Sequence, residues 1–255
     1  MKNIRGKKIS IIMPAFNEAG HIGASLDETV RTFSAFNCDY EIVVIDDGSS
    51  DDTYKNAKQN AEKYPQGLII VKRTRSNYGK GRALKKGFRY TKGDYIIFLD
   101  ADMDLHPGQI DTFFDIMQLT ETDVVIGSKR HPNSVVFFPW HRRVMSLFYF
   151  FLIKIMFGLP IKDTQTGLKL FKRKVLTDVF PKVLILQFAF ALELLANAHL
   201  FGYKIAEAPV YITSQRDNTR IGILTIYKMC VDTISIYYRF LKTRIKYVFK
   251  KKRVG

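Results

Sequence analysis

Residues 95–104, YIIFLDADMD, join a short apolar run to three aspartates at alternate positions. The first five of these residues are apolar or aromatic, which predicts a strand buried on both faces of a sheet. Side chains at i and i+2 of an extended backbone point the same way, so Asp100, Asp102 and Asp104 are expected to face one crevice. The stretch therefore predicts a sheet with a cluster of carboxylates at its edge.

The same arrangement recurs along the first half of the chain. Runs of strand length alternate with helical patterns, and the strand candidates are Ile9 to Met13, Glu41 to Ile45, Leu68 to Val71, Tyr95 to Leu99 and Asp123 to Ile126. This alternation predicts an α/β fold with a doubly wound, Rossmann-like, mostly parallel sheet flanked by helices. Ligands of such sheets bind beyond the carboxyl ends of the strands.

The composition fits one folded domain with an appendage. Of 255 residues, 47% are apolar and 25% are charged, which excludes a disordered tail, a fibre or a disulfide-stapled mini-protein. Cys38 and Cys230 lie far apart without a metal-type spacing, so neither a disulfide framework nor a zinc module is predicted. The net charge of +16 indicates an anionic partner, which is a nucleic acid, a phosphorylated ligand or an acidic lipid surface.

Acidic clusters in so basic a chain indicate a divalent cation. Residues 46–51, DDGSSD, and residues 100–104 each follow a predicted strand. Hard oxygen ligands suit Mg²⁺ or Mn²⁺, which in turn bridge the diphosphate of a nucleotide. Asp and Gly are also the usual residues of turns and helix caps, and that role alone would explain one cluster. Two clusters, with Asn17 and Glu18 at a third strand end, favour the cation site and argue against a nucleic-acid-binding module, which predicts a basic stripe.

Basic residues follow other strands at the same predicted edge. Residues 73–82, RTRSNYGKGR, come after the third strand and open a helix. Their glycines match neither the Walker pattern nor GxGxxG, so the spacing alone is weak evidence for a phosphate loop. A helix N-terminus with basic neighbours can still hold a phosphate. Lys129 and Arg130, after the fifth strand, add two cations.

Five segments together resemble a known family. They are residues 10–18 (SIIMPAFNE), 45–51 (IDDGSSD), 77–81 (NYGKG), 100–102 (DAD) and 163–171 (DTQTGLKLF). This combination resembles the inverting family 2 glycosyltransferases of GT-A fold, and among them the polyprenyl-phosphate (dolichol-phosphate) glucosyl- and mannosyltransferases. The resemblance runs from about Ile9 to about Arg220. It implies an enzyme that moves a hexose from a nucleotide diphosphate sugar to a polyprenyl phosphate.

The resemblance also implies a role for each matching residue. Donor contacts fall on Pro14, Phe16, Glu18, Ile45, Asp47, Asp100, Ala101, Asp102, Asp104, Lys129 and Arg220; the metal on Asp102 and Asp104; the acceptor phosphate on Arg142 and Ser146; and catalysis on Asp100, Asp102, Lys129 and Arg142. Phe16 stands where Tyr is common, and Asp104 stands where the mannosyl enzymes have Gln. Lys129 replaces an Arg, which is the better bidentate partner for phosphate. A lipid monophosphate is already anionic near neutral pH, so the attack needs no strong side-chain base.

The donor and the acceptor are separate questions. Residues 163–167 and the glycine turn 79–81 resemble the glucosyl type more, so UDP-glucose is the first expected donor and GDP-mannose the second. Other family members transfer to a polysaccharide or a glycolipid, and a shared fold does not exclude those acceptors. A non-catalytic basic binding subunit that keeps the fold is a further alternative. Retention of Glu18, Asp100 and Asp102 argues against an inactive site.

Two segments suggest association with the cytoplasmic face of a membrane. The expected layout is a GT-A domain at residues 1–220, with an interfacial helix at about 140–160, and a basic amphipathic segment at 221–255. The expected apolar face of the latter comprises Ile234, Tyr237, Tyr238, Leu241, Ile245, Val248 and Phe249, flanked by Arg239, Lys242, Lys246, Lys250 and Arg253. Basic and aromatic residues beside an apolar helix are typical of an interfacial element. The alternative is that both helices pack on their own domain.

Overall fold

The computed structural model describes residues 6–36, 38–136, 140–187, 189–212 and 231–244, and it leaves the side chains of residues 140–146 and 148 undescribed. The strands are β1 (Lys8–Ala15), β2 (Asp39–Asp46), β3 (Ile69–Arg73), β4 (Tyr95–Phe98), β5 (Val124–Ser128), β6 (Lys169–Lys172) and β7 (Ile205–Pro209). The helices are α1 (Ile22–Ala35), α2 (Thr53–Ala61), α3 (Lys80–Phe88), α4 (Ile110–Leu119), α5 (Trp140–Phe157), α6 (Arg173–Val179) and α7 (Phe190–Leu200), with 3-10 turns at Pro107–Gln109 and Phe180–Lys182. A further helix occupies residues 231–244.

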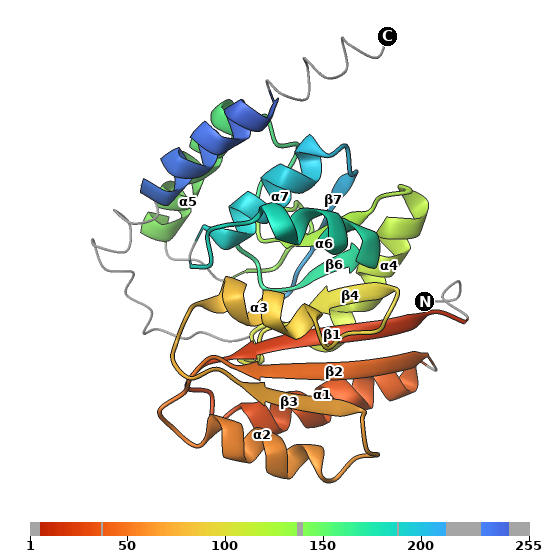
Figure 1. Ribbon diagram of the computed structural model, residues 1–255. Coiled ribbons are helices and arrows are strands. Elements are labelled where there is room, and N and C mark those ends of the chain that lie inside the picture. Colours follow the sequence, from red (N-terminus) through yellow and green to blue (C-terminus); the bar gives the residue numbers. More distant parts are fainter. Residues whose placement is uncertain (1–5, 37, 137–139, 188, 213–230, 245–255) are drawn as a thin grey trace.

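The strands form one mostly parallel sheet, as the sequence predicts. Within the described residues the order is β3-β2-β1-β4-β6-β5-β7 (Figure 1). The five predicted strands correspond to β1 to β5, whereas β6 and β7 were not predicted. β6 runs antiparallel to both β4 and β5. β6 therefore begins at the edge of the sheet where β4 and β5 end.

The core lies in two layers, one on each face of the sheet. Along β1, Ile11 faces the layer that holds α1, α2 and α4, while Ile12 faces the layer that holds α3, α6 and α7. Along β4, Ile97 belongs to the first layer and Phe98 to the second. All four side chains are buried. This double covering explains why the parallel strands are apolar at nearly every position.

The helix at residues 231–244 contributes to the second layer and lies beside α5 (Figure 1). Its Ile236 and Phe240 are buried, at 2% and 6% exposure. Ile234 and Tyr238 are 63% and 70% exposed. Ile234 and Tyr238 of the predicted apolar face therefore point outward, whereas Ile236 and Phe240, on another side of the helix, dock on the domain. Contact of the predicted face with lipid stays a prediction.

Helix α5 fills most of the range predicted for an interfacial helix. Its Ile153 and Phe157 are buried in the second layer of the core. Leu147, Phe151 and Ile155, spaced four residues apart, are exposed on the other side. Among the described residues, no helix combines the length and apolar character that crossing a bilayer requires.

Candidate active site

The aspartates that follow β4 lie in a turn at the carboxyl edge of the sheet. Met103 has a φ of 63°. The backbone N–H of Asp104 donates to Asp102 Oδ1 at 3.1 Å. The predicted extended backbone is therefore wrong at this point, because a left-handed residue turns the chain between Asp102 and Asp104. The carboxylates of Asp100, Asp102 and Asp104 are nevertheless all partly exposed at this edge.

Two segments that are distant in sequence hold Asp100. Lys80, the first residue of α3, places its Nζ 2.5 Å from Asp100 Oδ1 and 2.7 Å from Oδ2. Gly167 lies in the loop before β6, where an added Cβ would be 2.1 Å from Asp100 Oδ2. A side chain at position 167 would therefore displace the carboxylate. Asp100 is oriented by a cation on one side and by close-packed backbone on the other.

Asp163 organises the loop of residues 163–167. Its Oδ2 accepts the backbone N–H of Lys129 at 3.0 Å and the Thr166 hydroxyl at 2.6 Å. Its Oδ1 accepts the backbone N–H of Gln165 at 2.8 Å. Because β6 runs antiparallel to β5, the segments after β5 and before β6 meet at the same edge. The loop therefore links Lys129 to the surroundings of Asp100.

Lys169 begins β6 beneath this loop and is 4% exposed. Its Nζ donates to the backbone carbonyl of Thr166. Burial, reinforced by the charge of Lys80, lowers the pKa of Lys169 to about 7, although Asp163 and Asp100 favour the charged form. The sequence reasoning gave this lysine no role. The available signal was a lysine that opens a short strand-like run, KLFK.

Asp47 directly follows β2 and fixes the glycine turn of residues 77–81. It is 3% exposed. Its Oδ2 accepts the backbone N–H of Gly79 at 2.7 Å, and its Oδ1 accepts the backbone N–H of Tyr78 at 3.3 Å. The Thr74 hydroxyl donates to Oδ1 at 3.1 Å. This carboxylate therefore shapes the turn that begins α3.

Two of the predicted donor contacts are buried residues. Ile45 is 0% exposed and packs with Val43 and Ala83 under α3. Ala101 is 2% exposed. The donor contact that the resemblance assigns to Ile45 and Ala101 stays a prediction. Because both side chains are buried, their backbone atoms would have to make this contact.

The loop after β1 is joined to the loop after β2. Asn17, with a φ of 55°, donates its backbone N–H to Ser49 Oγ at 2.9 Å. The backbone N–H of Glu18 donates to Thr53 Oγ1 at 2.7 Å. Phe16, beside these anchored residues, is 43% exposed. Its ring is available to stack on a flat ligand.

The structure gathers many of the predicted residues at one edge. Beyond β1 lie Phe16 and Glu18, beyond β2 Asp47, beyond β4 Asp100, Asp102 and Asp104, and beyond β5 Lys129, with Pro14 near the end of β1 itself. Arg142 and Ser146 lie on α5, where their side chains are undescribed. Arg220 lies outside the described residues altogether. The roles of all the predicted site residues stay predictions.

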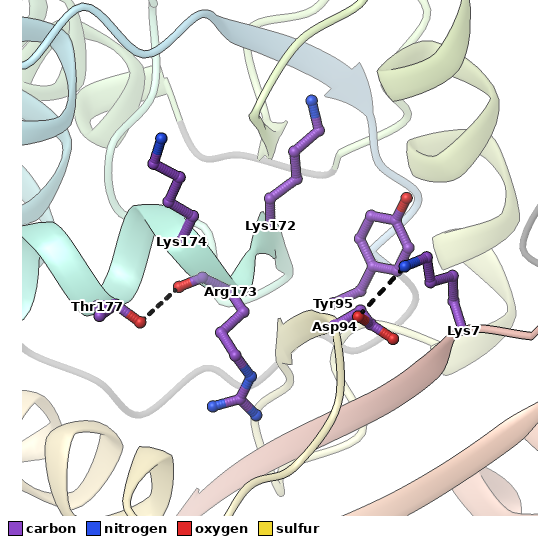
Figure 2. A pocket seen from close by; sticks show the side chains of 7 residues that line it. All are labelled: Lys7, Asp94, Tyr95, Lys172, Arg173, Lys174 and Thr177. Atoms are coloured by element: carbon purple, nitrogen blue, oxygen red, sulfur yellow. Dashed lines mark hydrogen bonds and ion pairs between the residues drawn. The ribbon is translucent and has the colours of Figure 1, made fainter.

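A hollow of about 450 Å³ lies at the opposite end of β4 (Figure 2). It is lined by Lys7, Asp94, Tyr95, Lys172, Arg173, Lys174 and Thr177. Tyr95 is the first residue of β4, whereas the acid turn follows its last residue. Two of the lining lysines form ion pairs. Lys7 Nζ lies 3.5 Å from Asp94 Oδ1, and Lys172 Nζ lies 2.8 Å from Asp123 Oδ1. This hollow is separate from the site at the carboxyl edge.

Comparisons with known proteins agree with this geometry. The pattern of glycosyl transferase family 2 matches residues 10–180. The dolichyl-phosphate beta-glucosyltransferase of Dictyostelium discoideum is 30% identical over 244 residues, which cover 91% of this chain and 75% of that protein. The dolichyl-phosphate beta-glucosyltransferase of Homo sapiens is 28% identical over 255 residues, which cover 92% of this chain and 76% of that protein.

Solved structures share the fold. Glucosyl-3-phosphoglycerate synthase from Mycobacterium tuberculosis, in complex with Mn²⁺, uridine diphosphate and phosphoglyceric acid, matches with a TM-score of 0.69 at 21% identity, over 92% of this chain and 80% of that one. Mannosyl-3-phosphoglycerate synthase from Rubrobacter xylanophilus matches with a TM-score of 0.69 at 16% identity, over 96% and 77%. The family pattern covers more than half of the chain, including the strands whose carboxyl ends build the candidate site. The protein therefore belongs to glycosyl transferase family 2 and is a glycosyltransferase of GT-A-like fold.

Proposed function

We propose that this glycosyltransferase moves glucose from UDP-glucose to dolichyl phosphate or a related polyprenyl phosphate. The observation that carries the proposal is the edge where the acid turn of residues 100–104 lies beside Lys80, with Lys129 tied to the adjoining loop. Carboxylates suit a divalent cation, and lysines suit the phosphates of two substrates. The relatives named as dolichyl-phosphate beta-glucosyltransferases support both the sugar and the lipid. GDP-mannose is the second donor to test.

Mg²⁺ or Mn²⁺ fits the acid turn as a site that the substrate completes. In the part of the chain that the structure describes, no three His, Cys, Asp or Glu side chains are grouped to hold a metal by themselves. Asp102 and Asp104 would supply two carboxylates, and protein-bound Mg²⁺ commonly combines one or two carboxylates with substrate phosphates and waters. When bound, the cation stabilises charge on the departing nucleotide. The Mn²⁺ in a structural neighbour supports this cofactor.

The residues of the chain would position two anions for reaction. A phosphate oxygen of the lipid forms a bond to the anomeric carbon while the bond from that carbon to the nucleotide breaks, and the nucleotide leaves with the electron pair. Attack from the opposite side inverts the anomeric configuration. Asp100 would orient the donor sugar, and Lys129 would offset phosphate charge. Arg142 and Ser146 would receive the acceptor phosphate, and Arg220 would close over the donor.

The exposed apolar face of two adjacent helices supports membrane association. Its members are Leu147, Phe151 and Ile155 on α5 and Val231, Ile234 and Tyr238 on the helix at residues 231–244. The helices are joined where the ring of Phe157 lies 5.3 Å from that of Phe240. Exposed cations accompany this face, among them Lys154, Lys242 and Arg244. Apolar residues flanked by cations suit the anionic cytoplasmic leaflet.

These exposed apolar residues support a division of the chain into a catalytic domain and a membrane-association segment. We place the catalytic domain at residues 1–220 and the membrane-association segment at residues 221–255. Because Ile236 and Phe240 are buried in the domain core, the segment also helps to complete the fold.

The test is transfer of labelled sugar from UDP-glucose and, in parallel, from GDP-mannose to a short polyprenyl phosphate. Each reaction is run with Mn²⁺, with Mg²⁺ and with a chelator. Lipid-linked glucose formed only with a metal present is the expected result. Product from GDP-mannose alone would contradict the donor, and intact nucleotide binding without lipid-linked product would contradict the acceptor.

A further inference from the structure

Glu193 of α7 is a buried carboxylate that joins two separate segments. It is 2% exposed. Its Oε1 accepts from Arg239 Nη2 at 2.8 Å and Nε at 3.2 Å. Its Oε2 accepts the backbone N–H groups of Leu184 and Ile185 at 2.9 and 2.7 Å. One oxygen therefore serves the helix at residues 231–244, and the other serves the loop before α7.

The next residues of that loop contact the glycine turn. The backbone N–H of Gly81 donates to the Leu186 carbonyl at 3.0 Å. Gln187 Nε2 donates to the Tyr78 carbonyl at 3.2 Å. A Cβ added at Gly79 would lie 2.6 Å from the Leu186 carbonyl oxygen, so the two backbones are in close contact. A shift of the loop is therefore transmitted to the turn.

The glycine turn reaches the acid cluster of the site. Gly79 donates to Asp47, and Lys80 pairs with Asp100. These contacts thus form a continuous series from Arg239 through Glu193 and the loop of residues 184–187 to Asp100. Every step is a hydrogen bond, an ion pair or a neighbouring residue in the chain.

We infer that Glu193 and Arg239 are a positioning pair, through which the docked C-terminal helix sets the geometry of the turn of residues 78–81. This inference rests on the proposed function in one respect, namely that the turn borders the nucleotide-sugar site. Removing Arg239 takes away the cation that is hydrogen-bonded to the buried Glu193 carboxylate and leaves only the more distant charge of Lys85, whose Nζ donates to the Val183 carbonyl, which is unfavourable. The loop relaxes toward water, and the turn loses the contacts made by Leu186 and Gln187.

The test compares Arg239→Ala with Lys242→Ala, which removes an exposed cation from the same helix. Amide hydrogen exchange is followed in the peptide that covers residues 76–84, without nucleotide. Exchange at Tyr78, Gly79 and Gly81 is expected to accelerate about tenfold in Arg239→Ala and to stay unchanged in Lys242→Ala. Unchanged exchange in Arg239→Ala would overturn the inference.

Two further variants and the KM values of the two substrates separate this inference from the proposed function and from general unfolding. In Glu193→Gln, the amide oxygen can still accept from the loop, but the charge that pairs with Arg239 is lost, so a smaller acceleration at the same amides is expected. Arg239→Lys, which keeps one charge, should recover part of the protection. In Arg239→Ala, the KM for UDP-glucose should rise while the KM for the lipid stays unchanged. Accelerated exchange in a protein that binds no nucleotide would contradict the proposed function alone.

Discussion

Asp102 has a structural contact as well as its proposed role as a metal ligand. Its Oδ1 accepts the backbone N–H of Asp104 and so closes the acid turn. A hydrogen bond to this partly exposed carboxylate contributes about 1 kcal/mol to stability. A metal ligand at the leaving group contributes far more to the transition state than to the fold. Loss of the Asp102 carboxylate should therefore reduce sugar transfer far more than it reduces folding stability.

Asp102→Ala is accordingly expected to abolish metal-dependent transfer while lowering the free energy of unfolding by about 1 kcal/mol. The measurements are sugar transfer with Mn²⁺ and urea unfolding on the same preparation. Asp115→Ala, which changes an exposed acid on α4, is the control and should keep full activity. Turnover like that of the wild type in Asp102→Ala would remove Asp102 from the metal site.

Gly167→Ala tests the close approach of backbone to Asp100. A Cβ at position 167 would lie 2.1 Å from Oδ2, so the Asp100 carboxylate must shift from the position in which it pairs with Lys80. Displacement of a positioning group by about 1 Å can reduce turnover about a hundredfold. Gly20→Ala is the matched control, since an added Cβ there meets nothing within 4 Å. Equal kcat values in the two variants would show that Asp100 is not positioned through residue 167.

Lys169 predicts a pH dependence of stability. Its pKa falls from an ordinary value of 10.5 to about 7 in the folded protein. Between these values the unfolded chain binds a proton that the folded chain does not, so the free energy of unfolding rises with pH across this window. Below about pH 7 the destabilising contribution is fully present, and it disappears above about pH 10.5. Urea unfolding at several pH values should show this rise in the wild type but not in Lys169→Met, and parallel curves would contradict the lowered pKa.

Residues that follow a strand could be predicted, whereas residues that act across the fold could not. Asp100 is recognisable because it directly follows an apolar run, and Asp47 because it lies one residue beyond one. The importance of Gly167 depends on its closeness to Asp100, which is more than sixty residues away in the sequence. No local pattern encodes that contact. Even for Asp47, which is predicted to contact the donor and does lie at this edge, no local pattern predicts the hydrogen bond to the glycine turn.

At the scale of elements, the same limit explains β6, one of the two strands that were not predicted. β1 to β5 contain short apolar runs between helices, and the length and β-branched composition of these runs identify them. β6 has only four residues, with lysine at each end. Its place between β4 and β5 depends on backbone pairing, such as Ile97 with Leu170 and Val125 with Leu170. Pairing of this kind is set by the tertiary fold rather than by a local signal.

The proposed contact of α5 with a membrane can be tested at an exposed residue, with an equally exposed residue of α4 as the control. Ile155 on α5 is 83% exposed, and Leu119 on α4 is 84% exposed. Ile155→Glu should weaken binding to anionic vesicles about tenfold, because it places a negative charge in the face proposed to meet the lipid. Leu119→Glu adds the same charge on the other layer and should bind as the wild type does. Equal binding by both variants, measured by vesicle sedimentation, would remove α5 from the membrane face.

At the scale of the whole molecule, charge and apolar surface are expected to act together at the membrane. The chain carries a net charge of +16. Residues 245–255 include five of the cations and no acid. Each cation near an anionic leaflet contributes about 1 kcal/mol at low salt.

Removing residues 245–255 should therefore weaken binding to anionic vesicles at low ionic strength while leaving transfer to a detergent-solubilised acceptor unchanged. At about 1 M salt the truncated and complete chains should bind equally, because screening removes the electrostatic contribution. Sedimentation across a salt series is the measurement. A loss that persists at high salt would show that the segment binds through its apolar residues instead.

The antiparallel strand has a consequence for how such an enzyme diversifies. β5 ends and β6 begins at the same edge, where the Gly127 N–H donates to the Leu168 carbonyl at 3.0 Å. The forty residues between Ser128 and Lys169, α5 included, thus leave the sheet and return to it at one place. That excursion can lengthen, shorten or be transplanted between homologues without rethreading any strand. If Arg142 and Ser146 receive the acceptor phosphate as proposed, the residues that select the acceptor form one contiguous segment, and a chimaera that exchanges it should change acceptor preference.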